Sequence, residues 1–226
     1  ISKLLQSDSA TKILLQKGEK VSLHVRRSSQ SFTPTGAFTP SGDRSGLIQP
    51  LLMPLAIDDA LYQFQRTGVA WLLQHKRALL ADDMGLGKTP QALAAVRRLF
   101  RHGKVDRCLI IAPRTLLANW QEEAAIWAPE LLVATALPSS SERTEVWEKA
   151  IRSAHLVLTS YENIRNPPMP LLDKPPDLII ADEAHRLRKA SSQTTHGIRK
   201  IQSQRFWALT GTPVERDKED IAVLLS

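Results

Sequence analysis

Disulfide bonds and membrane segments are the first features that this sequence lacks. Its only cysteine, Cys108, has no partner, so no internal disulfide can form, which agrees with a reducing compartment. No apolar run approaches the ~18–20 residues of a membrane-spanning helix, and the opening residues ISKLLQSDSATK lack the apolar core of a signal peptide. We expect an intracellular, soluble protein without a membrane partner, cytoplasmic in a prokaryote or nuclear in a eukaryote.

Positive charge is what the sequence has in excess. The chain has 30 Lys and Arg residues against 23 Asp and Glu, a net charge of +7. Such an excess favours polyanionic partners, with nucleic acid first among them. The 42% of hydrophobic residues and the length of 226 are typical of one full globular domain with an appendage. Because the chain begins with isoleucine and ends in IAVLLS, we expect a fragment of a longer protein.

Two regions of different composition follow each other along the chain. From Lys12 to Arg26, apolar and polar residues alternate around a Lys-Gly-Glu turn, which predicts a β-hairpin. Residues 28 to about 50 are rich in Ser, Thr, Pro and Gly, as in a loop or linker. We therefore expect a small β-rich N-terminal extension, residues 1–50, before a larger domain, residues 51–226.

The larger domain shows an alternation of short apolar runs and segments with helical spacing. Apolar strands separated by amphipathic helices indicate an α/β fold, with a mostly parallel sheet covered by helices on both faces. Cys108 lies within one such run and is interpreted as a core residue. The predicted strands are 77–82, 107–113, 131–137, 155–160, 177–182 and 205–210, and the predicted helices are 88–101, 115–127, 141–152 and 191–202.

A glycine-rich turn follows the first of these strands, in LLADDMGLGKTPQ, residues 79–91. Ligands of such sheets bind outside the carboxyl ends of the strands. Backbone N–H groups around Gly85 and Gly87 would face a phosphate, together with the N-terminus of the next helix. Lys88 would reach the outer phosphates, and the hydroxyl of Thr89 would ligate magnesium. The segment therefore predicts a phosphate-binding loop.

Asp82 departs from the common phosphate-loop pattern, which has glycine there, so a plain strand–helix turn remains an alternative for this segment alone. A second signal is DLIIADEAH, residues 177–185, another strand that ends in two carboxylates. Asp182 would hold magnesium through its water shell, and Glu183 would orient and deprotonate the attacking water. His185 would link the site to the next loop. A helix cap is the alternative here, but the two segments together favour ATP and Mg²⁺.

Five segments in order resemble successive motifs of the Swi/Snf family of helicase-like double-stranded-DNA translocases, in helicase superfamily two. They are LLADDMGLGKTPQ, IIAPRTLLANWQEE, LVLTSYENIR, LIIADEAHRLRK and WALTGTPVE, and the resemblance covers about Leu61 to Leu225. The family has aspartate at the position of Asp82, which accounts for that residue, whereas Asp83 replaces its usual glutamate. The resemblance implies a RecA-like P-loop lobe that binds ATP and Mg²⁺.

An upstream segment, LYQFQRTGVAWLL, is similar to the adenine-recognition segment of the family. Gln65 and Gly68 have the spacing of that segment, and Phe64 takes the place of a tyrosine. A glutamine can bind the edge of adenine through two hydrogen bonds. Without the other motifs, Gln65 would be interpreted as a polar residue on an amphipathic helix.

The resemblance also implies contacts with the DNA backbone. Arg114 and Thr115 in one segment, and Thr159 and Ser160 in another, would meet phosphates without reading sequence. Helix N-caps at Thr115 and Ser160 are the alternative. The five tryptophans are interpreted as packing residues, because no platform of adjacent aromatics supports base stacking: Trp71, Trp120, Trp127, Trp147 and Trp207.

A motif near the end of the chain, Thr210-Gly211-Thr212, resembles the one that couples ATP hydrolysis to movement along DNA. Its short hydroxyl side chains would exchange partners between Asp182, His185 and the nucleic acid. Motors of this superfamily close two lobes around ATP, and the second supplies an arginine finger worth ~10³–10⁵ in rate. Nothing after the motif resembles that lobe, so we expect the second RecA-like lobe elsewhere in the parent chain. We also expect this fragment alone to hydrolyse ATP slowly.

The sequence thus indicates the N-terminal ATP-binding lobe of an ATP-dependent double-stranded-DNA translocase. A strand-separating DNA helicase or a DEAH-type RNA helicase is one alternative, although MGLGKT and LTGTP argue against RNA. A non-catalytic, nucleotide-dependent scaffold is another, opposed by the intact Lys88, Asp182 and Glu183. A protein partner would bind the N-terminal extension.

Overall fold

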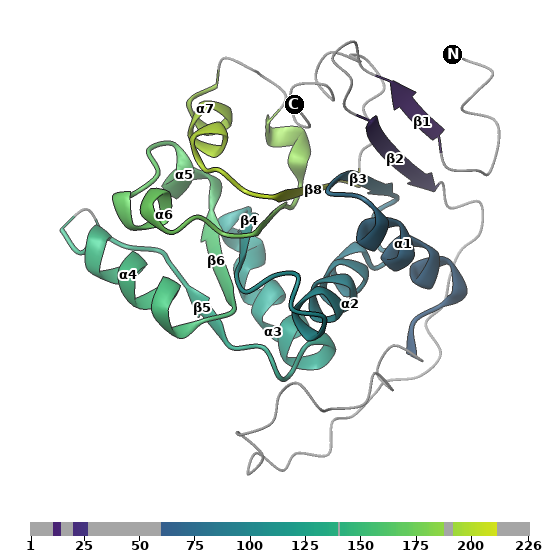
Figure 1. The fold of residues 1–226 in the computed structure, drawn as a ribbon, viewed down its shortest axis with the longest axis horizontal. Helices are drawn as coiled ribbons and strands as arrows, with labels where there is room; N and C mark the ends of the chain where they lie inside the picture. The colour runs from purple at the N-terminus through teal and green to yellow at the C-terminus, as the bar shows by residue number, and fades with distance from the viewer. Residues whose placement is uncertain (1–10, 15–19, 27–59, 140, 188–191, 212–226) are drawn as a thin grey trace.

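The computed structural model describes residues 11–14, 20–26, 60–139, 141–187 and 192–211, and the predicted linker and Thr212 lie outside them. The described strands form one eight-stranded sheet in the order β1-β2-β3-β8-β7-β4-β6-β5 (Figure 1). The strands are β1 (Thr11–Leu14), β2 (Lys20–Arg26), β3 (Arg77–Asp82), β4 (Cys108–Ala112), β5 (Val133–Thr135), β6 (Leu156–Ser160), β7 (Leu178–Ala181) and β8 (Arg205–Leu209).

The six strands from β3 to β8 pair in parallel, as the apolar runs predict. Each lies within a predicted range, and β3 has the predicted bounds. Parallel strands are covered on both faces and so need apolar residues at successive positions. All the residues of β4 are buried, including Cys108 with its free thiol. Burial raises the pKa of this thiol well above its ordinary value. The α/β prediction is confirmed.

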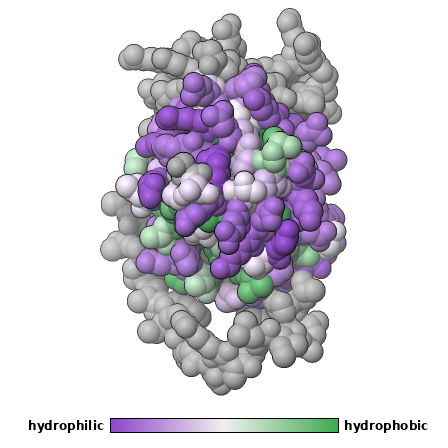
Figure 2. Space-filling view, turned by 90° about the vertical axis from the view of Figure 1, so that its left-hand side faces the viewer, coloured by the Kyte–Doolittle hydropathy of each residue, from purple (hydrophilic) through white to green (hydrophobic). Residues whose placement is uncertain are grey.

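Helices cover the two faces of the sheet. One face packs on α1 (Gln63–Gln74), α2 (Lys88–Arg101) and α3 (Leu117–Trp127), and the other on α4 (Arg143–Ser153), α5 (Tyr161–Ile164), α6 (Met169–Asp173) and α7 (Gln193–Lys200). Leu80 belongs to the first core and its neighbour Leu79 to the second, because successive strand residues point to opposite faces. The outer surface on the α4 side is mostly hydrophilic (Figure 2).

Helices α2, α3, α4 and α7 match the four predicted segments with small shifts. α2 has the predicted bounds, whereas the segment from residue 115 begins with a 3₁₀ turn, Arg114–Leu116, before α3. The short helices α5 and α6 were not predicted, because four or five residues are too few to show helical periodicity. No helix among the described residues has the length and apolar character needed to cross a membrane.

The two strands of the predicted N-terminal hairpin, β1 and β2, pair in antiparallel fashion, and the predicted turn between them lies outside the described residues. In addition, β2 pairs in parallel with β3, the strand that leads into the glycine-rich turn. The β1–β2 pair therefore extends the sheet beyond β3, the strand that precedes the glycine-rich turn. The division of the chain at residue 50 stays a prediction.

Candidate functional site

The turn between β3 and α2 requires glycine at two positions. Gly85 has φ +81° and Gly87, the N-cap of α2, has φ +72°, values that residues with a Cβ rarely adopt. A Cβ on Gly87 would also lie 2.4 Å from Nε2 of Gln65, whereas around Gly85 the space is open. Backbone conformation and close packing thus explain the glycines, and the turn leads directly into the N-terminus of α2.

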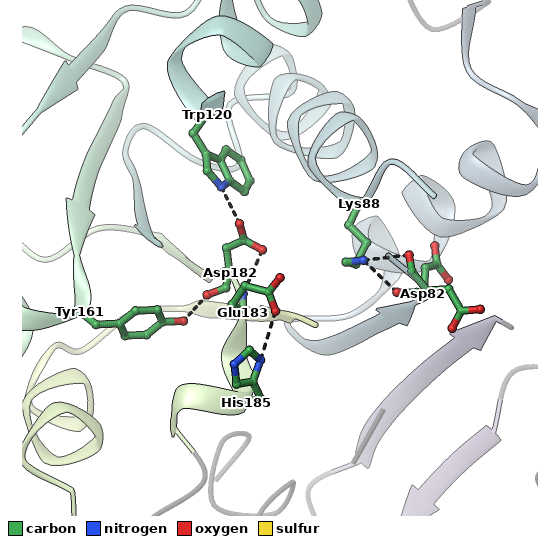
Figure 3. Close-up of polar contacts among 8 residues, drawn as sticks. Asp82, Lys88, Trp120, Tyr161, Asp182, Glu183 and His185 are labelled. Atoms are coloured by element: carbon green, nitrogen blue, oxygen red, sulfur yellow. Dashed lines mark hydrogen bonds and ion pairs between the residues drawn. The ribbon is translucent and has the colours of Figure 1, made fainter. Parts of the chain in front are cut away.

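Lys88 is half-buried at the start of α2 and folds back over the turn. Its ammonium group donates hydrogen bonds to the carbonyl oxygens of Asp82 at 2.9 Å and of Asp83 at 3.0 Å (Figure 3). Burial lowers the pKa of Lys88, while the carboxylates of Asp82, Glu183, Asp182 and Asp83 oppose that shift. Lys88, the residue predicted to bind phosphate, therefore interacts electrostatically with the carboxylates of the DLIIADEAH segment.

Asp82 is fully buried, with its carboxylate turned into the protein. The amide of Gln91, one turn into α2, donates to Oδ2 of Asp82 at 2.9 Å and to the carbonyl of Gly87 at 3.2 Å. An acidic residue in a phosphate-binding turn is tolerable when its charge points away from the anion. Gln91 was missed by sequence reasoning, although a polar residue among the apolar positions of α2 was a usable signal.

Gln65 lies beside the same turn. Its Nε2 donates to the carbonyl of Leu86 at 3.2 Å, and its Oε1 accepts from the N–H of Tyr62 at 3.0 Å. Gln65 is 7% exposed, and both polar atoms of its side chain already have protein partners. Adenine recognition by Gln65 stays a prediction, one that would require it to exchange these partners.

Asp182 directly follows β7 and accepts hydrogen bonds from three sides (Figure 3). The indole N–H of Trp120 donates to Oδ2 at 2.8 Å, the backbone N–H of Glu183 donates to Oδ1 at 2.9 Å, and the hydroxyl of Tyr161 donates to the carbonyl oxygen. Burial raises the pKa of the Asp182 carboxyl, and the bond from Trp120 opposes that shift. Trp120 packs in the core as predicted, but its polar contact was missed.

Glu183 has φ +51°, a left-handed conformation that no other non-glycine residue of the described part adopts. Such backbone strain is common at functional sites. Its carboxylate Oε2 lies 3.1 Å from Nδ1 of His185, and both side chains are partly exposed. Ala184 starts a short 3₁₀ turn, Ala184–Leu187, so the two carboxylates do not cap a regular helix.

The Thr210-Gly211 segment lies against the glycine-rich turn. The N–H of Thr210 donates to the carbonyl of Leu80 at 3.1 Å. A Cβ on Gly211 would lie 2.6 Å from Cγ of Met84 and 3.3 Å from Nζ of Lys88. The structure therefore brings this predicted coupling segment next to the predicted phosphate ligand.

The four predicted nucleic-acid residues have different surroundings. Arg114 and Thr115 are exposed after β4, whereas Thr159 and Ser160 are buried at the end of β6. The hydroxyl of Thr159 donates to the carbonyl of Ala136 at 2.7 Å, and Ser160 is the N-cap of α5 without a side-chain capping bond. Contact with a nucleic acid stays a prediction for all four, and the exposed pair is the more accessible.

Comparison with known proteins gives concordant results. Residues 64–226 match the SNF2-related domain. The DNA excision repair protein ERCC-6-like of Mus musculus is 33% identical over 182 residues, which cover 76% of this chain and 15% of that protein. The ISWI chromatin-remodeling complex ATPase ISW1 of Saccharomyces cerevisiae is 32% identical over 180 residues, covering 76% of this chain and 16% of that protein.

Solved structures agree. The Sulfolobus solfataricus SWI2/SNF2 ATPase core in complex with dsDNA superposes with a TM-score of 0.67 at 28% identity, over 77% of this chain and 37% of that one. The same core domain in a second structure gives 0.65 at 27% identity, over 86% and 39%. The chain thus corresponds to a minor part of these proteins, and it belongs to the SNF2-related domain family, as its motifs predict.

Proposed function

We propose that this chain is the N-terminal ATP-binding lobe of an ATP-dependent motor that moves along double-stranded DNA. The observation that carries the proposal is the position of Lys88, which lies across the carboxyl edge of the sheet from Asp182 and Glu183, within the electrostatic influence of both carboxylates (Figure 3). A cation at a helix N-terminus opposite two carboxylates suits a phosphate chain and its metal ion.

The residues around the turn fit ATP and magnesium. The N–H groups of the Gly85–Gly87 turn and the half-buried Lys88 would bind the phosphates, with Lys88 exchanging its two carbonyl partners for phosphate oxygens. No group of three His, Cys, Asp or Glu side chains in the described part could hold a metal alone. Thr89 and Asp182 would therefore hold Mg²⁺ together with phosphate and water, and the ion would neutralise charge on the phosphates.

Glu183 would act as the general base. The strained backbone at this residue directs a partly exposed carboxylate toward the space in front of Lys88 (Figure 3). There it would orient a water molecule and accept its proton. His185, 3.1 Å from the same carboxylate, would stabilise the orientation of Glu183 and link it to the following loop.

Coupling to DNA would use the segments that surround this site. Gly211 touches the phosphate-binding turn, so a change at the phosphates would displace the Thr210-Gly211-Thr212 segment. Arg114 and Thr115 would contact the DNA backbone, in line with the net charge of +7 and with a relative solved in complex with dsDNA. The second RecA-like lobe would come from the rest of the parent protein, and the β1–β2 hairpin is a candidate contact for a protein partner.

The test is the ATPase rate of the intact parent protein without nucleic acid, with duplex DNA, with single-stranded DNA and with RNA. The proposal expects strong stimulation by duplex DNA, and loss of turnover with retained ATP binding in Glu183→Gln. Preference for single strands or RNA would favour a strand-separating helicase. A nucleotide-dependent scaffold would be supported instead if no nucleic acid stimulated the ATPase and Glu183→Gln behaved like wild type.

A further inference from the structure

Two buried aromatic side chains hold Asp182 from opposite faces of the sheet. Trp120 of α3 belongs to the core on the α1–α3 face and donates its indole N–H to Oδ2 at 2.8 Å. Tyr161, the first residue of α5, belongs to the core on the α4–α7 face and donates its hydroxyl to the carbonyl oxygen of Asp182. The carboxylate and the peptide group of one residue are thus fixed from both sides (Figure 3).

These aromatic residues lie close in sequence to the two segments predicted to contact nucleic acid. Trp120 lies on the helix that directly continues the 3₁₀ turn containing Arg114 and Thr115. Tyr161 directly follows Ser160 at the end of β6. A displacement of either segment would therefore act on Asp182 through a single side chain and a hydrogen bond.

Packing alone does not explain the direction of the Trp120 indole. Trp147 is just as completely buried, on the opposite face, and its Nε1 has no hydrogen-bond partner among the described residues. A buried tryptophan in this fold can thus do without a partner for its N–H group. The bond from Trp120, together with that from the Glu183 N–H, fixes the orientation of both carboxylate oxygens of Asp182.

We propose that Trp120 and Tyr161 are positioning residues that orient Asp182 for the metal ion and connect the nucleic-acid segments to it. The inference rests on the proposed function and deepens it, by naming the route from bound DNA to the ATP site. Residues that orient a metal ligand typically change metal affinity about 10–100-fold when mutated.

The first test measures binding instead of turnover, in the intact parent protein. The Kd of a fluorescent ADP analogue is determined with and without Mg²⁺ for wild type, Trp120→Phe, Tyr161→Phe and Trp147→Phe. Phenylalanine keeps a buried ring and removes only the donor group and some ring area. The measured quantity is the ratio of the Kd without Mg²⁺ to the Kd with Mg²⁺. We expect this ratio to be about tenfold smaller in Trp120→Phe than in wild type, and to fall by less in Tyr161→Phe. Trp147→Phe is the matched control and keeps the wild-type ratio.

The second test measures the connection to DNA. In Trp120→Phe and Tyr161→Phe, stimulation of the ATPase by duplex DNA falls several-fold, while the Kd for that DNA stays as in wild type. Wild-type values for the Mg²⁺ ratio and the stimulation in both variants would overturn the inference. So would equal losses in Trp120→Phe and Trp147→Phe, because a general packing defect would then explain them.

The two tests separate this inference from the proposed function. If wild type shows no stimulation by duplex DNA, the proposed function fails, and the Mg²⁺ ratio alone decides whether the two aromatics orient Asp182. If Trp120→Phe does not fold, Tyr161→Phe carries both measurements, because it removes one hydroxyl from an otherwise unchanged ring.

Discussion

A Cβ atom on Gly68 would lie 1.8 Å from Oε1 of Gln91. Gly68 belongs to α1 and Gln91 to α2, so the two helices meet at the side chain that bonds to the glycine-rich turn after β3. The amide of Gln91 donates from its other end to Asp82 and Gly87. The small residue at position 68 therefore determines where this amide can lie.

The first prediction concerns Gly68→Ala. The new methyl group displaces the Gln91 amide, which is buried and cannot move away without losing its bonds to Asp82 and Gly87. We expect a loss of ~1–3 kcal/mol in the free energy of unfolding, as for other overpacked sites, and weaker binding of ADP. Urea unfolding and ADP titration measure the two effects.

Its control is a double-mutant cycle with Gln91→Ala. This substitution removes the atom that the methyl group would meet, so Gly68→Ala should cost much less in that background. Equal costs in the two backgrounds would show that the contact with Gln91 is not the cause.

The sequence predicts the elements that depend on local patterns. β3 and α2 have the predicted bounds, because an apolar run and a helical periodicity are both legible within a few residues. The contacts of Gln91, Trp120 and Tyr161 were not predictable in the same way. Each depends on which rotamer reaches across from another element, and no local pattern carries that information.

Gly211→Ala is the second prediction. The added methyl group would press on Met84 and approach Lys88, but Met84 is 73% exposed and its side chain can move aside. We therefore expect a change below ~1 kcal/mol in stability and a clear loss of DNA-stimulated turnover. The rate is measured with and without duplex DNA. Because Met84→Ala makes room at the same contact, adding it should recover part of the rate; a combined variant as slow as Gly211→Ala would contradict the steric explanation.

A third prediction concerns the buried ion pair between Arg97 of α2 and Glu130, which follows α3. Nε of Arg97 donates to Oε1 of Glu130, and each side chain is only 1% exposed. Arg97→Met would leave the Glu130 carboxylate buried without this cation, at a cost of ~3–5 kcal/mol in unfolding free energy. Adding Glu130→Leu should recover most of that loss, because neither charge of this pair is then left buried.

The matched control is the exposed pair Glu148–Arg152, whose side chains are 45% and 70% exposed. Arg152→Met should cost less than ~1 kcal/mol, because water screens that pair. Similar losses from Arg97→Met and Arg152→Met in a urea titration would mean that burial does not set the energy of the inner pair.

The last prediction concerns the pH dependence of stability through Glu123 of α3. Burial raises the pKa of Glu123 above its ordinary 4.5, an effect that a hydrogen bond with Trp127 opposes and nearby Glu122 reinforces. Between 4.5 and the raised value, the folded protein binds more protons than the unfolded chain. The contribution of Glu123 to stability is therefore fully present below that window and is lost as the pH rises through it.

Glu123→Gln removes this ionisation and retains an acceptor for Trp127. We expect the variant to be more stable than wild type at neutral pH, by less than ~1 kcal/mol because the side chain is only half-buried. The difference should vanish as the pH falls below 4.5, where both proteins carry a neutral group at this position. Urea unfolding across this range measures it, with the exposed Glu122→Gln as a control that should give a smaller gain. A difference that grows as the pH falls would contradict the sign derived from burial.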